Sequence, residues 1–128
     1  VVEDGTDVTL IAVGDMVSRA AEAAKKLKEE KISAAVIDMA SVKPIDEALV
    51  IEYAKKTGCI VTAEDHNVMG GLGGAVSEVL AKHQPVPQEM VGLQDQFGRS
   101  GSPADLAEYY GLTAEKIVEA AKKCMQRK

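Results

Sequence analysis

The chain has 128 residues and a mass of 13.5 kDa, which fits one domain and excludes a complete cofactor-using transferase of two or three domains. Its 46% hydrophobic residues are enough for a core, so general disorder is also excluded. With 3% aromatic residues and a net charge of −5, the composition argues against binding of nucleic acid or of an anionic membrane surface.

The first part of the chain predicts a strand, a helix and a second strand. Residues 8–13 form a continuous apolar run, which is typical of a buried parallel strand. Asp15 offers a cap for an amphipathic helix over residues 16 to about 30, where apolar positions recur every three or four residues. Residues 32–37 form the next strand. This order within about 30 residues predicts a right-handed βαβ unit.

The middle of the chain repeats the alternation. Asp46 is predicted to cap a helix that Gly58 closes. Residues 59–63 are predicted as a third strand. The glycine-rich turn at residues 70–74 then opens a helix that reaches Leu80.

The last part predicts a fourth strand at residues 89–93 and two helices. Pro103 occupies the first position of a short helix that ends at Gly111. Thr113 is predicted to cap a final helix that reaches Ala121. Apolar strands that alternate with helices indicate an α/β fold, with a mostly parallel sheet and helices on both faces.

Acidic residues follow each predicted strand, at the edge where open α/β sheets bind ligands: Asp15, Asp38, Glu64 with Asp65, and Asp95. Grouped carboxylates there can hold Mg²⁺, as in a freestanding receiver-like module. The alternative is that each caps a helix or a turn, and we favour it. A receiver requires an acidic pair after the first strand and a lysine after the last, and both are missing.

The glycine cluster permits two interpretations. Residues 71–73 follow a strand and open a helix, and Asp95 comes 22 positions after Gly73, which imitates a dinucleotide-binding fingerprint. Val76 occupies the third glycine position, so this match is weak. The alternative, which we favour, is a tight loop whose glycines permit positive φ and close backbone contact with a partner.

His66 follows two carboxylates at a predicted strand end, where it could act as a general base or a proton shuttle. A turn or interface residue is the more common role of a single histidine. His83 is predicted at a helix end, where the helix dipole alone explains it. Residues 99–102 precede a helix and could bind an anion or form an ordinary capped loop.

The two cysteines, Cys59 and Cys124, fit neither a metal-site spacing nor a disulfide framework. A reduced, buried thiol is expected at Cys59. No stretch approaches about 18 continuous apolar residues, so no membrane span is expected. These features predict a soluble cytoplasmic protein.

Several sequence blocks occur in an order that closely resembles the C-terminal domain of transketolase over the whole chain. The most specific are Lys43-Pro-Ile-Asp46 and Glu64-Asp-His66 followed by Gly70-Gly-Leu-Gly73. The other blocks are Asp7-Val-Thr-Leu-Ile-Ala-Val-Gly14, Val36-Ile-Asp38, Asp95-Gln-Phe-Gly-Arg-Ser-Gly101 and Tyr110-Gly-Leu-Thr113. Related domains close 1-deoxyxylulose-5-phosphate synthase and the β subunits of 2-oxoacid dehydrogenases. The Glu-Asp-His triplet favours transketolase over these two alternatives.

The resemblance implies a three-layer α/β/α domain over residues 1–128, with a mixed sheet of about five strands. One edge strand is antiparallel, and residues 1–3 would be what is present of it. The resemblance further implies that the domain is part of a longer chain, or of the C-terminal part of a split-subunit bacterial transketolase.

In that family thiamine diphosphate and its Mg²⁺ or Ca²⁺ lie between two earlier domains, which also supply the residues that handle the sugar phosphate. The enzyme transfers two-carbon ketol units, and the pathway implied is the pentose phosphate pathway. No catalytic, cofactor-binding or metal residue is therefore expected in this chain, and we expect the isolated domain to be inactive. The partners implied are the remaining transketolase domains or subunit, in a homo-oligomer such as a dimer. The candidate interface loop comprises Asp65, His66, Gly70, Gly71 and Gly73.

Overall fold

The computed structural model describes residues 1–14, 16–39, 45–65, 71–93 and 103–128. For Asp65, Leu93 and residues 103–112 it describes the backbone only. Asp15, which the sequence predicts as a helix cap, lies outside the described residues.

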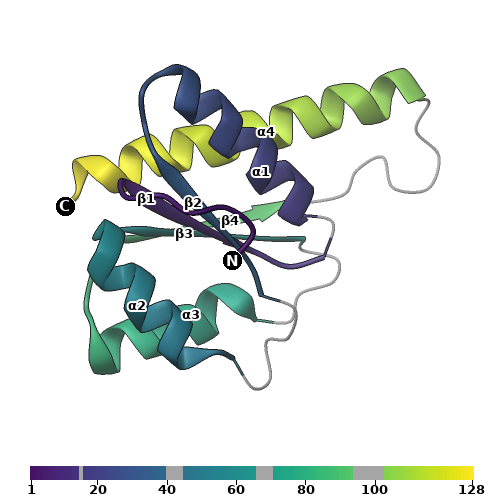
Figure 1. Cartoon of the computed structure of the whole chain (residues 1–128). Coiled ribbons are helices and arrows are strands. Elements are labelled where there is room, and N and C mark those ends of the chain that lie inside the picture. The colour runs from purple at the N-terminus through teal and green to yellow at the C-terminus, as the bar shows by residue number, and fades with distance from the viewer. Residues whose placement is uncertain (15, 40–44, 66–70, 94–102) are drawn as a thin grey trace.

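Four strands alternate with four helices in the described part of the chain. All neighbouring strands pair in parallel, in the order β2-β1-β3-β4. Helices α1 and α4 cover one face of the sheet, and α2 and α3 cover the other (Figure 1). The elements are β1 (Val8–Ala12), α1 (Met16–Glu29), β2 (Ala34–Asp38), α2 (Glu47–Thr57), β3 (Ile60–Asp65), α3 (Leu72–His83), β4 (Gln88–Leu93) and α4 (Pro103–Gln126).

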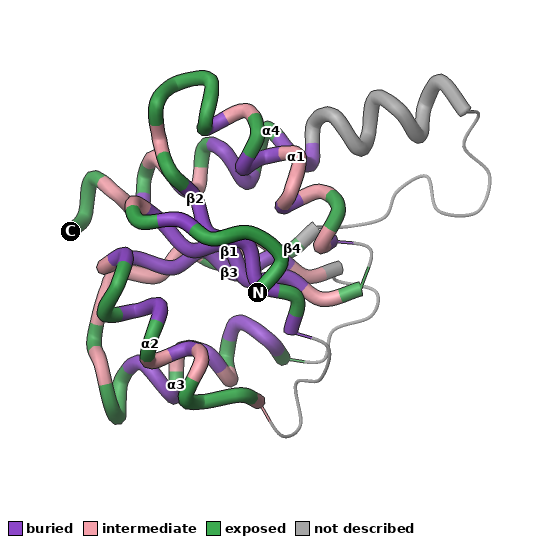
Figure 2. Tube along the Cα trace, in the orientation of Figure 1, coloured by how far each residue is buried: buried purple, intermediate pink, exposed green. Residues whose placement is uncertain are grey.

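The strands β1, β2 and β3 are buried along most of their length, as their continuous apolar sequences predict, whereas the edge strand β4 is partly exposed (Figure 2). Successive side chains point to opposite faces of a strand. Leu10 therefore packs into the core below α1 and α4, whereas Ile11 packs into the core against α2 and α3. The three-layer α/β/α fold expected from the sequence is confirmed.

The ends of α2 match the sequence signals. The Asp46 carboxylate accepts a hydrogen bond from the Leu49 N–H at 3.1 Å, which satisfies one free donor of the first turn. Gly58 adopts a left-handed conformation with a φ of 76°, and its N–H donates to the Ala54 carbonyl at 2.9 Å.

The predicted break in the last helical region is wrong. Instead of one helix ending at Gly111 and another capped by Thr113, α4 runs without interruption over Pro103–Gln126. A glycine inside a helix costs only about 1 kcal/mol relative to alanine. Burial of Ile117 and Ala121 against the sheet offsets that cost, and Thr113 is itself buried within the helix.

Residues 1–3 pair with the edge of the sheet, where the family resemblance implied an antiparallel strand. The pairing is a single antiparallel bridge between Glu3 and Val36, so the sheet has four full strands in the described residues rather than five. Gly5 is required beside this bridge. A Cβ there would lie 2.3 Å from the backbone carbon of Ala34, a distance that no side chain tolerates.

Asp4 fastens the same N-terminal segment to α2. Its Oδ1 accepts hydrogen bonds from the Tyr53 hydroxyl at 3.0 Å and from Lys56 Nζ at 2.5 Å. The Lys56 ammonium also lies over the Tyr53 ring, 5.3 Å from its centroid. The hydrogen bond from Lys56 lowers the pKa of Asp4, and the same contact raises the pKa of Lys56.

A buried hydroxyl cluster joins the end of α2 to β1 and β3. Thr57 Oγ1 lies 2.7 Å from Thr9 Oγ1, 2.9 Å from the Tyr53 carbonyl oxygen and 3.0 Å from the Cys59 carbonyl oxygen. A hydroxyl has one proton to donate. Thr57 shares its single proton between the two carbonyl oxygens. Thr9 is therefore the donor in the hydrogen bond between the two hydroxyls.

This arrangement predicts unequal costs for two isosteric substitutions. Thr57→Val leaves the buried Thr9 hydroxyl without an acceptor and should lower the free energy of unfolding by about 1–3 kcal/mol. Thr9→Val leaves the Thr57 donor satisfied and should cost less. Urea unfolding of both variants at an unchanged m-value measures the difference. Equal losses would contradict the proton arrangement.

Candidate functional site

The carboxyl ends of all four strands meet at one edge of the sheet, because every strand pair is parallel. The candidate interface loop connects β3 to α3 at this edge. Asp65 is the last residue of β3, Gly71 precedes α3, and Gly73 lies in the first turn of α3. His66 and Gly70 lie outside the described residues, so the predicted role of His66 stays a prediction.

The Glu64 carboxylate holds the two ends of this loop together. Its two oxygens accept hydrogen bonds from the Leu72 N–H at 3.2 Å and the Gly73 N–H at 2.9 Å. These are free donors at the positive end of the α3 dipole, where a negative charge is stabilising. Gly71, the N-cap residue, has no side chain with which to cap the helix. The strand-end acids were predicted either to hold Mg²⁺ or to cap a helix or turn, and Glu64 caps a helix.

Gly71 has the positive φ predicted for a tight loop. Its φ is 76° and its ψ is 28°, which is a left-handed conformation that favours glycine. The residue is exposed, and nothing lies within 4 Å of the position that a Cβ would occupy. The backbone at this point is therefore open to a neighbouring surface.

Gly73 serves a different purpose, because it permits close packing of α3 on the sheet. A Cβ at Gly73 would lie 2.8 Å from Met90 Sδ on β4 and 3.4 Å from Thr62 Oγ1 on β3. Gln88 reinforces the contact by donating from Nε2 to the Gly73 carbonyl at 3.1 Å. The absence of a side chain at Gly73 thus allows α3 to approach β3 and β4 closely. This packing explains the glycine without a bound dinucleotide.

An exposed apolar side chain lies beside the loop. Met90 projects from β4 with 62% of its surface exposed, next to the first turn of α3. A shallow groove of about 330 Å³ continues from Met90 along α3, past Ser77, Leu80 and Val86. Sequence reasoning missed Met90, because the sequence of β4 does not show which of its apolar side chains the neighbouring helices leave exposed.

The other acidic residues form no metal site in the described part of the chain. Asp38 is exposed at the end of β2, and no three His, Cys, Asp or Glu side chains among the described residues are grouped to hold a metal ion. Asp15 and Asp95 lie outside the described residues, as do residues 99–102. His83 ends α3, as predicted. No described helix has the length and apolar character needed to cross a membrane.

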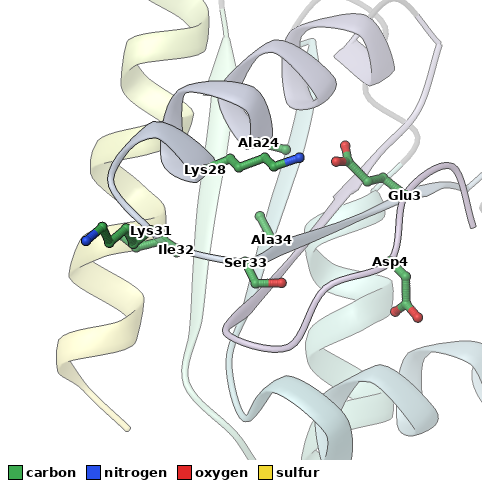
Figure 3. Close-up of a pocket in the computed structure, with 8 residues that line it drawn as sticks. All are labelled: Glu3, Asp4, Ala24, Lys28, Lys31, Ile32, Ser33 and Ala34. Atoms are coloured by element: carbon green, nitrogen blue, oxygen red, sulfur yellow. The ribbon is translucent and has the colours of Figure 1, made fainter.

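A pocket of about 260 Å³ lies at the opposite edge of the sheet, where β2 begins (Figure 3). It is lined by both charge signs, including Glu3 from the N-terminal segment and Lys28 from α1. Its position beside Ser33 and Ala34 is remote from the strand ends that carry the candidate interface loop. We therefore take the loop, not this pocket, as the candidate functional site.

Comparison with known proteins gives matches over nearly the whole chain. The model of the family described as transketolase, C-terminal domain, matches residues 1–117. A 6-deoxy-6-sulfo-D-fructose transketolase subunit from Clostridium sp. (strain MSTE9) is 46% identical over 125 residues, which are 98% of this chain and 39% of the relative. A 1-deoxy-D-xylulose-5-phosphate synthase from Desulforudis audaxviator is 41% identical over 123 residues, 94% of this chain and 19% of the relative.

Among solved structures, a split gene transketolase described as an inactive beta4 tetramer superposes with a TM-score of 0.85 at 52% sequence identity. The match covers 100% of this chain and 42% of that chain. The chain thus spans less than half the length of each of these three proteins.

The cap formed by Glu64 predicts a measurable loss of stability. Glu64→Ala removes two charge-assisted hydrogen bonds from the start of α3 and should lower the free energy of unfolding by about 1–2 kcal/mol. Glu64→Gln keeps one oxygen acceptor, so its free energy of unfolding should lie between those of the native chain and of Glu64→Ala. Hydrogen exchange at the Leu72 and Gly73 amides should accelerate in both variants.

Glu78→Ala is the matched control, since Glu78 lies on the same helix and makes only an exposed ion pair with Lys82. Its loss should stay within about 0.5 kcal/mol. A Glu64→Ala variant no less stable than the Glu78→Ala variant would show that the carboxylate does not support the loop.

Proposed function

Because this chain belongs to the family of transketolase C-terminal domains, we propose that it is a non-catalytic domain of a thiamine-diphosphate-dependent enzyme that transfers two-carbon ketol units between sugar phosphates. Its role is to pack beside the active-site domains and to help protomers associate. The match of the family model to residues 1–117 carries the proposal. The catalytic residues, thiamine diphosphate and Mg²⁺ or Ca²⁺ are assigned to parts of the enzyme outside these 128 residues.

The use of the strand-end acid supports a non-catalytic role. Each oxygen of Glu64 accepts a hydrogen bond from an N–H group of α3, so the described contacts of its carboxylate are to the backbone. In the described ranges, no three His, Cys, Asp or Glu side chains are grouped to hold a metal ion. We therefore derive no step of the reaction through residues of this chain.

The candidate interface loop is where we place the contact with a neighbouring domain or protomer. Three observations support this: Glu64 fixes both ends of the loop, Gly71 leaves open space above its backbone, and Met90 adds an exposed apolar surface. Exposed apolar side chains on a rigid frame are typical of protein interfaces. The solved relative is described as a tetramer, which supports association beyond a single chain.

The proposal stops at the class of reaction and extends to no particular sugar. One relative is named for a sulfonated deoxyfructose and another as a 1-deoxyxylulose-5-phosphate synthase, at similar identities to this chain. The pentose phosphate pathway and the cytoplasm are the pathway and the location that the family resemblance implies, and we propose them on that ground alone. Assays of the complete enzyme for ketol transfer and for 1-deoxyxylulose 5-phosphate formation separate the two reactions.

A substitution in the loop tests the interface in the complete enzyme. Gly71→Arg places a long charged side chain in the open space above the loop and should weaken protomer association. Since a misplaced active-site neighbour costs about 100-fold in rate, activity should fall by one to two orders of magnitude. Sedimentation velocity and ketol-transfer assays measure the two effects, and the isolated chain should show no transfer.

Two variants separate the interface effect from other causes. Gly71→Ala introduces the backbone strain of about 1 kcal/mol without the bulk. Gln126→Arg adds the same charge and bulk at an exposed position at the end of α4, away from the loop. Both should retain association and activity. A Gly71→Arg enzyme with normal association and activity would refute the proposed interface.

A further inference from the structure

Two free thiols from distant parts of the chain meet inside the core. Cys59 immediately precedes β3, and Cys124 lies near the end of α4. Both side chains are fully buried in the core between the sheet and helices α1 and α4. The burial of Cys59 agrees with the sequence-based prediction, which covered neither the burial of Cys124 nor the proximity of the two residues.

The contacts of the two sulfurs place the end of α4 across the start of β3. Cys124 Sγ donates to the carbonyl of Ile60 at 3.4 Å and to the carbonyl of Pro87 at 3.3 Å. Ile60 is the residue that follows Cys59. The methylene chain of Lys128 passes 3.8 Å from the position of a Cβ on Gly58, the residue before Cys59.

Both sulfurs belong to the same buried layer, where Cys59 Sγ donates to the Asp7 carbonyl at 3.5 Å and Cys124 Sγ reaches the carbonyl of the residue that follows Cys59. The interaction between the two thiols makes them unequal. It raises the pKa of Cys59 and lowers the pKa of Cys124. The thiolate is the form of cysteine that reacts with oxidants. Cys124 is therefore the thiol suited to react first, with Cys59 beside it to complete a disulfide.

The last turn of α4, which follows Cys124, is held against β4 by contacts on the surface of the protein. The Arg127 guanidinium pairs with the Glu89 carboxylate and donates to the Gln88 carbonyl at 3.0 Å. Lys123 adds a longer ion pair to Glu89 at 3.9 Å. Exposed ion pairs contribute little, and helix ends open locally far more easily than whole domains unfold. Opening of this turn gives a small oxidant access to the thiols.

We propose that Cys59 and Cys124 form an oxidisable dithiol site, which a hydroperoxide converts reversibly into a disulfide joining the end of α4 to the start of β3. With hydrogen peroxide, the Cys124 thiolate attacks one oxygen and the O–O bond breaks. A sulfenic acid forms, and the leaving hydroxide takes up the proton that the thiol released and departs as water. The Cys59 thiol then attacks that sulfur, the S–S bond forms, and a second water leaves. The two sulfurs together lose two electrons, and the peroxide gains them.

Hydrogen peroxide added to the folded chain tests the site. Titration of thiols after denaturation should show that both disappear together, and peptide mass spectrometry should find Cys59 joined to Cys124 within one chain. Dithiothreitol should restore both thiols. In Cys59→Ser the reaction should stop at a sulfenic acid on Cys124 that dimedone traps, whereas Cys124→Ser should leave Cys59 unreacted.

A pair of variants with both cysteines intact tests how the site opens. Arg127→Ala removes the clamp on the last turn of α4 and should speed disulfide formation several-fold. Lys122→Ala is the control, because it removes an exposed ion pair of the same helix, to Glu30, that does not cover the thiols. It should leave the rate unchanged.

Two results would overturn the proposal. One is a pair of thiols that stay unreacted in peroxide until the chain unfolds, in the native sequence and in Arg127→Ala alike. The other is oxidation that yields only disulfides between chains or irreversibly oxidised cysteine. Because Arg127→Ala leaves the core unchanged, these results remain decisive even if a serine variant fails to fold.

Discussion

The parallel pairing of β3 between β1 and β4 is the constraint on which the rest of the domain depends. A parallel strand cannot be connected to its neighbour by a tight turn, so each strand is followed by a helix that crosses back over the sheet. Both faces of β3 are thereby covered, and its residues Ile60 and Val61 pack into different cores. The two ends of β3 are then the places where polar chemistry can occur.

The amino end of β3 accepts hydrogen bonds from buried side chains in addition to that from the Thr9 N–H of β1. The carbonyl of Cys59 accepts from Thr57, and the carbonyl of Ile60 accepts from the Cys124 thiol. Sulfur and hydroxyl groups are small enough to satisfy backbone carbonyls inside an apolar layer. The carboxyl end carries a charged group instead, Glu64, because the free amides of α3 face it. One strand thus supports the proposed dithiol site at one end and the first turn of α3 at the other.

The parts of the fold that sequence reasoning predicted correctly are those with local causes. The cap at Asp46 and the left-handed Gly58 each depend on a few neighbouring residues, and so does the positive φ at Gly71. The predicted break at Gly111 was wrong because a local signal competed with burial further along α4, which the sequence pattern does not weigh. The contact of Cys124 with the Ile60 carbonyl, next to Cys59, and the contact of Asp4 with Lys56 join segments that only the tertiary fold brings together. No local pattern encodes them.

At the carboxyl edge of the sheet, the described part of the chain uses the acid Glu64 to support a helix. In an open α/β sheet, an acid at a strand end contributes to ligand binding only if its oxygens remain free to meet the ligand. Here both oxygens bind the first amides of α3, and Met90 occupies the space above Gly73 that a bound group would need. Among the described residues next to α3, the exposed groups are the backbone at Gly71 and the apolar side chain of Met90. These groups offer shape and apolar area, which fit the contact with another protein domain that we propose.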